Sequence, residues 1–160
     1  MGKVISTFSR GWAGAVSRSK DDVIISLKNA DSAPIPFGAP VFIRVNDQGV
    51  INFNAETTGY DTFVGFAVRV ADKTPPTQQA FSGQYEPGDI VEVLTRGTVT
   101  LPIATSYSRA GDKLYIRKAD AKLTITPGSE GTSIQIENAV LRGTRDAAGF
   151  SEVTLLERRM

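Results

Sequence analysis

The sequence predicts an all-β protein: an antiparallel β-barrel or a jelly-roll-like sandwich with an extended N-terminal arm. Three observations favour this fold class. Apolar and polar residues alternate at period two in short runs, clusters of Gly, Pro, Asn and Asp separate these runs, and no stretch has the 3.6-residue period of an amphipathic helix. A chain of 160 residues suits one domain. We place the arm at residues 1–22 and a single β-domain at residues 23–160.

The stretch 84–102 carries the strongest strand pattern. Val91 and Val93 alternate with Glu92, and a second alternating run follows at 98–101. Arg96-Gly97 lies between the two runs, where we expect a tight turn or a β-bulge. The pattern at the start of this stretch occurs at several places in the chain: a Gly follows a small residue, Pro or Phe just before a predicted strand. We therefore assign structural turns to Gly38, Gly88, Gly97 and Gly111.

Further strands are expected along the rest of the chain by the same alternation. Residues 40–53 form a β-hairpin, with Asn46-Asp47-Gln48-Gly49 as its connection. Gly65 indicates a bulge or a close backbone approach within its strand. Residues 29–36 are expected to be a loop, since two prolines interrupt any ladder there. The other strands are predicted at 23–27, 62–70, 113–117, 122–126, 132–141 and 152–156.

Two segments are candidate interfaces. The arm has little potential to form a core and no steady period, but it carries aromatic and basic side chains, which are enriched at protein interfaces: Phe8, Arg10, Trp12 and Arg18. The second candidate is the long irregular stretch 71–83, with Pro75, Pro76 and Phe81. The alternatives are a disordered terminus for the arm and an ordinary solvated loop for 71–83.

Composition excludes several functions. The chain has no His and no Cys, so histidine acid–base chemistry, thiolate chemistry, disulfides and Cys/His metal sites are absent. Its net charge of +1 gives no support to nucleic-acid binding. No apolar run is long enough for a membrane span, and no apolar segment of a secretory signal follows Met1. We find no catalytic motif and expect no enzyme activity, no cofactor and no metal.

Several of these patterns together resemble a known family. Val64-Gly65-Phe66-Ala67 is followed by Tyr85-Glu86-Pro87-Gly88-Asp89, then by the run 91–99, then by Ala110-Gly111-Asp112-Lys113-Leu114-Tyr115-Ile116. This order is similar to that of the small cement, or decoration, proteins of tailed-bacteriophage capsids. The resemblance covers roughly residues 34–156, and its motifs are structural glycines and strand patterns.

The resemblance implies a structural virion protein that binds the major capsid protein on the outside of the shell and clamps neighbouring subunits. It also implies a homo-oligomer, for which we favour a dimer over a trimer, made in the host cytoplasm. Two other hypotheses stay open. One is another virion β-domain, such as a tail or baseplate component, and the other is a small β-barrel enzyme or sugar-binding module.

Overall fold

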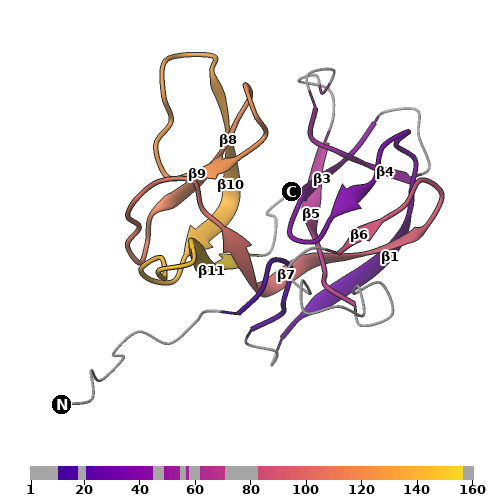
Figure 1. Cartoon of the computed structure of the whole chain (residues 1–160), viewed down its shortest axis with the longest axis horizontal. Helices are drawn as coiled ribbons and strands as arrows, with labels where there is room; N and C mark the ends of the chain where they lie inside the picture. The colour runs from indigo at the N-terminus through magenta and orange to yellow at the C-terminus, as the bar shows by residue number, and fades with distance from the viewer. Residues whose placement is uncertain are drawn as a thin grey trace.

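A computed structural model gives the structure of the chain (Figure 1) and describes residues 11–17, 21–44, 49–54, 57, 62–70 and 83–156. Within these ranges the secondary structure consists of strands alone, which confirms the predicted all-β fold. The strands are β1 (Val23–Asn29), β2 (Ile35–Pro36), β3 (Pro40–Ile43), β4 (Gly49–Asn52), β5 (Thr62–Ala67), β6 (Gln84–Tyr85), β7 (Ile90–Pro102), β8 (Lys113–Arg117), β9 (Leu123–Thr124), β10 (Ser133–Leu141) and β11 (Phe150–Leu155).

Nine of the strands form one sheet that closes on itself over part of its length. Their order is β1-β4-β3-β5-β7-β11-β10-β8-β9, and a further pairing of β1 with β7 closes the first five strands into a barrel. Figure 1 shows the two parts, with β1, β3, β4 and β5 on one side and β8–β11 on the other. The predicted antiparallel pairing holds for these strands with one exception, because β1 runs parallel to β4 through Lys28 and Asn29.

Strand β7 belongs to both parts. It runs without a break through 13 residues, so the tight turn considered at Arg96-Gly97 is not formed. Instead the register with β1 shifts beside Arg96, the irregularity of a bulge, and Gly97 takes a φ of +125°. Before this point β7 pairs with β1 and β5, and from Gly97 onward it pairs with β11. The bulge therefore marks where the chain leaves the barrel for the second sheet.

Four strands of the barrel wall, β3, β4, β5 and β7, bury side chains on both of their faces. Val41, Val50, Ala67 and Val93 belong to one hydrophobic cluster, whereas their neighbours in sequence, Phe42, Ile51, Phe66 and Leu94, belong to another. Successive side chains of a strand point to opposite faces, so the first cluster fills the barrel and the second covers its outer face.

The second cluster joins the barrel to the sheet of β8–β11. Leu114 and Ile116 of β8, Leu141 of β10 and Val153 of β11 are at most 1% exposed and belong to it. Its barrel side includes edge-to-face aromatic contacts, with Phe63 5.6 Å from Phe42 and 5.4 Å from Phe66 between ring centroids. A core shared in this way makes the two parts pack as one unit.

The turns that precede three strands share one geometry. The amides of Ala39, Asp89 and Asp112 donate to the carbonyls of the residues three positions earlier, at 3.0–3.2 Å. The third residue of each turn is Gly, with φ of +77° at Gly38, +86° at Gly88 and +90° at Gly111. A positive φ at this position is the mark of a type II turn, for which Gly is the preferred residue.

Two short strands lie where the sequence indicated irregular structure or a turn. Ile35 pairs with Tyr85 and Pro36 with Gln84, forming the small sheet of β2 and β6. The prediction of a loop through 29–36 is therefore wrong at its two ends, since β1 also extends to Asn29. Pro36 fits here because a two-stranded sheet offers an edge position that needs no N–H.

Candidate functional site

Part of the predicted arm, residues 11–17, is docked onto the domain. Its backbone runs antiparallel to the second half of β7, with Val16 bridging Val99. The amide of Gly14 donates to Thr100 O, the amide of Thr100 donates to Ala15 O, and the amide of Ser17 donates to Thr98 O, each at 2.9 Å. The segment thus acts as an additional strand along β7, and the boundary placed after residue 22 stays a prediction.

Gly14 sits where only glycine fits. Its φ is +75°, and a Cβ there would lie 2.7 Å from Ala67 O, 2.8 Å from Gly38 N and 2.9 Å from Arg69 N. These are backbone atoms, which cannot yield as the end of a flexible side chain does. The amide of Arg69 also donates to Gly14 O at 2.9 Å. The close approach of Gly14 therefore locks the docked segment against the end of β5 and the turn at Gly38.

Trp12 holds the same segment through its side chain. The guanidinium carbon of Arg69 lies 5.8 Å from the Trp12 ring centroid and 5.6 Å from that of Phe37. Both distances suit a cation–π interaction. Phe37 is 4% exposed, whereas Trp12 keeps 40% of its surface exposed. Trp12 is thus an intramolecular anchor that still offers part of its ring to the surroundings.

The other predicted interface residues lie outside the described residues: Phe8, Arg10, Arg18, Pro75, Pro76 and Phe81. The four predicted turn glycines do not form one site. Gly38 contacts the docked segment, Gly97 packs against the Asp22 carboxylate at the bulge, and Gly88 and Gly111 have open space where a Cβ would be. Their common role is to shape the backbone.

An apolar surface on β1 was not anticipated. Val23 and Ile24 are each 43% exposed, Ile25 is 37% exposed, and Ile90, at the start of the paired strand β7, is 56% exposed. Among the described residues β1 pairs along 23–28 with β7, but on its other side only Lys28 and Asn29 pair with β4. Residues 23–27 are therefore a sheet edge with apolar side chains on both faces, and we call this segment the β1 edge.

The sequence did contain a signal for the β1 edge. Val23, Ile24 and Ile25 are consecutive β-branched residues, so they break the alternation that a half-buried strand shows. Such a run is typical of a strand covered on both faces. In this fold the cover is not supplied by the described residues, and a long exposed apolar edge favours pairing with another chain.

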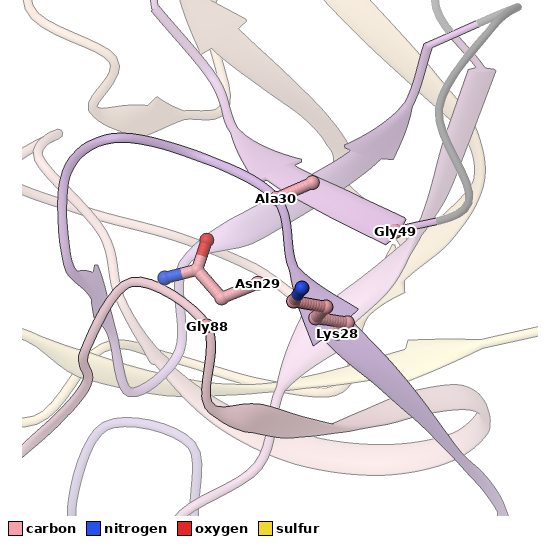
Figure 2. Close-up of a pocket in the computed structure, with 5 residues that line it drawn as sticks. All are labelled: Lys28, Asn29, Ala30, Gly49 and Gly88. Carbon is pink, nitrogen blue, oxygen red and sulfur yellow. The ribbon is translucent and has the colours of Figure 1, made fainter.

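The pocket in Figure 2 lies beside the end of β1 and has a volume of about 430 Å³, with Lys28, Asn29, Ala30, Gly49 and Gly88 around it. Asn29 is 1% exposed, and its amide nitrogen donates to the carbonyls of Ala33, Tyr85 and Glu86 at 3.1–3.3 Å. Its Oδ1 accepts from the amide of Asp31 at 2.9 Å. Asn29 therefore ties β1 to the turn before β7, and the pocket has no convergent reactive groups.

Arg117 and Asp120 form an ion pair at the surface. Arg117 donates to both carboxylate oxygens of Asp120, and this hydrogen bonding lowers the pKa of the Asp120 carboxyl to about 2. Across the described ranges, no three His, Cys, Asp or Glu side chains gather in a way that could hold a metal ion. No helix within those ranges is long and apolar enough to span a membrane.

Comparisons with known proteins identify a family and a similar fold. Residues 3–156 match the model of a family described as "Structural cement protein (E217 gp24/Pam3 gp6)". A chain in a solved structure titled "The capsid of Myoviridae Phage XM1" has a similar fold, with a TM-score of 0.70 and 19% sequence identity over 94% of this chain and 93% of that chain. No curated protein matches. The resemblance suggested by the strand and glycine motifs is confirmed, and the chain belongs to the structural cement protein family.

Proposed function

We propose that this protein binds the outside of a bacteriophage capsid and clamps neighbouring major capsid subunits. The observation that carries the proposal is membership of the structural cement protein family, which covers residues 3–156. The similarity in fold to a chain of the phage XM1 capsid supports it. The protein would be made in the host cytoplasm and act in the virion, with no catalytic step and no cofactor.

The mechanism is stabilisation by binding. A protein that binds only the assembled shell lowers the free energy of that state by an amount set by its affinity and free concentration. Many copies bound to one shell add their contributions, and a copy that touches two capsid subunits opposes their separation directly. This function needs a rigid, interlocked protein, and the core shared by the barrel and the second sheet supplies rigidity.

We place the capsid-binding surface around the docked segment. The exposed part of Trp12 lies there, and Phe8 and Arg10 precede this segment in the sequence. Aromatic and Arg side chains are frequent hot spots of interfaces. Docking fixes the backbone of 11–17 in advance, which lowers the conformational entropy lost on binding. The loop 71–83, with Pro75, Pro76 and Phe81, remains the alternative surface.

The experiment is co-sedimentation of the purified protein with empty expanded capsids. Full-length protein should pellet with the capsids in a saturable way, and failure to do so would overturn the proposed function. A variant lacking residues 1–10 keeps the docked segment and loses Phe8 and Arg10, so it should fold normally but bind at least about tenfold more weakly. A matched control is Tyr107→Ala, which truncates a residue 58% exposed in the connection between β7 and β8 and should leave binding unchanged.

Equal binding by the truncated and full-length proteins would exclude the arm, and the loop 71–83 would then be tested in the same way. Self-association is part of the proposal too. We propose a homodimer rather than a trimer, and its two linked copies would make twice the contacts with the shell that a single copy makes.

A further inference from the structure

We propose that the β1 edge pairs with the β1 edge of a second copy of this chain, so that two barrels form one continuous sheet across a twofold axis. This inference deepens the homodimer part of the proposed function and does not depend on capsid binding. It rests on three features of residues 23–27: hydrogen-bonding capacity, side-chain pattern and charge at the two ends.

The first feature is the open side of the strand. Residues 23–28 of β1 pair with β7 on one side, and on the other side the described residues contribute only the short parallel pairing of Lys28 and Asn29 with β4. A strand in this position presents backbone N–H and C=O groups that another strand can use. Strand addition at such an edge is a common mode of protein association.

The second feature is that the edge is complementary to itself. In an antiparallel pair with Ile25 opposite Ile25 of the second copy, Val23 meets Leu27 and Ile24 meets Ser26. In this register, residues opposite one another point to the same face of the joined sheet. Ile25 and Leu27 lie beside the buried Val93 and Val91 of the barrel interior. Val23, Ile25 and Leu27 of both copies would therefore extend one apolar layer through the dimer.

The third feature is charge. The β1 edge itself carries no charged residue; it is preceded by the exposed Asp21 and the partly buried Asp22 and followed by the exposed Lys28. In the register with Ile25 opposite Ile25, Asp22 of each copy lies opposite Lys28 of the other. Antiparallel pairing brings the acidic end of each strand to the basic end of the other, whereas parallel pairing would set like charges together. Opposite charges across strands favour pairing and like charges oppose it. The charges therefore select a second copy in the antiparallel orientation.

The first test measures self-association of the full-length protein by sedimentation equilibrium, without capsids. Ile24→Lys places a charge on a residue that is 43% exposed in the single chain, so the barrel should still fold. We expect the wild type to dimerise and the variant to have a dissociation constant at least about tenfold higher. Tyr107→Lys is the matched control, a charge on a residue 58% exposed in the connection between β7 and β8, and it should dimerise like the wild type.

A second test does not depend on Ile24→Lys folding. The chain has no Cys, so a single introduced thiol reports only its own neighbours. Ile25→Cys should form a disulfide-linked dimer on mild oxidation, because directly opposed residues of an antiparallel pair have Cα atoms about 4.5–5.5 Å apart, within the roughly 4.4–6.8 Å range of disulfides. Tyr107→Cys should not. A wild type that stays monomeric, or an Ile25→Cys variant that links no faster than Tyr107→Cys, overturns the inference.

Capsid co-sedimentation separates this inference from the proposed function. A monomeric Ile24→Lys variant that still pellets with capsids, but less tightly than the wild type, supports both. Normal dimerisation without capsid binding supports the β1 pairing and overturns the cement function. A monomeric wild type whose capsid binding is abolished by Ile24→Lys overturns the pairing of two copies and assigns the edge to the capsid.

Discussion

Replacing Gly14 by Ala tests whether the docked segment is part of the folded domain. The substitution adds one methyl group at a φ of +75°, where it would lie 2.7–2.9 Å from three backbone atoms. The left-handed conformation costs an L-residue roughly 1–2 kcal/mol, and forcing a methyl group into a filled space costs about 1–3 kcal/mol. We expect the free energy of unfolding to fall by about 2–5 kcal/mol.

Gly111→Ala is the matched control. Gly111 has a φ of +90° but open space around the position of a Cβ. The variant therefore carries the conformational cost without the steric one, and part of that cost is offset because Ala restricts the unfolded chain. We expect a loss of about 1 kcal/mol. The difference between the two variants isolates the close approach of Gly14 to the backbone of Ala67, Gly38 and Arg69.

The protein has a second way to relieve the strain, since residues 11–17 can detach from β7. The loss of stability would then be limited to the free energy of docking. The single Trp makes this outcome visible, because Trp12 is the only source of indole fluorescence. Detachment would shift its emission to the red and would expose the Thr100 amide, which donates to Ala15 O, to hydrogen exchange.

The assays are urea denaturation, Trp emission and amide exchange. The reasoning is refuted if Gly14→Ala matches Gly111→Ala in stability while Trp12 emission and Thr100 protection stay as in the wild type. That result would mean that the segment is not held by Gly14 in solution.

Three further predictions concern the rest of the domain. Tyr85→Phe removes the 2.6 Å hydrogen bond from a buried hydroxyl to Val68 O and should cost about 1–2 kcal/mol in urea denaturation, with no loss contradicting a buried bond. Asn29→Ala removes the side-chain donor to the carbonyls of Tyr85 and Glu86 and the acceptor of the Asp31 amide, and it should cost more than Tyr85→Phe by the same assay. The Asp120 carboxyl has its pKa lowered from 3.8 to about 2 by Arg117, so its contribution is complete above pH 4 and is lost as the pH falls toward 2. Asp120→Asn should remove that dependence, and an unchanged acid profile would exclude the pair.

The local features of the fold follow from the sequence. Alternation at 113–117 predicted β8 with its observed bounds, because one face of that strand is buried and the other is exposed. The glycines at 38, 88 and 111 indicated turns because a positive φ is easily available only to Gly. The absence of His and Cys restricted the possible chemistry without any structure.

Which segments that are distant in the sequence lie side by side was decided only by the tertiary structure. Alternation states which face of a strand is buried, but it does not state which strand lies beside it. The division of β7 between two partners and the parallel pairing of β1 with β4 could therefore not be read from the pattern.

The same limit applies to the candidate surfaces. The sequence placed Trp12 in an extended arm because its partner, Arg69, is distant in the sequence, and no local pattern indicates that the two side chains meet. Ile24 and Ile51 are equally apolar, yet one is 43% exposed and the other 1%. Hydrophobicity measures only the tendency of a side chain to be buried. Whether a side chain is in fact buried depends on which other elements or partner proteins cover it, and this is a property of the assembled fold.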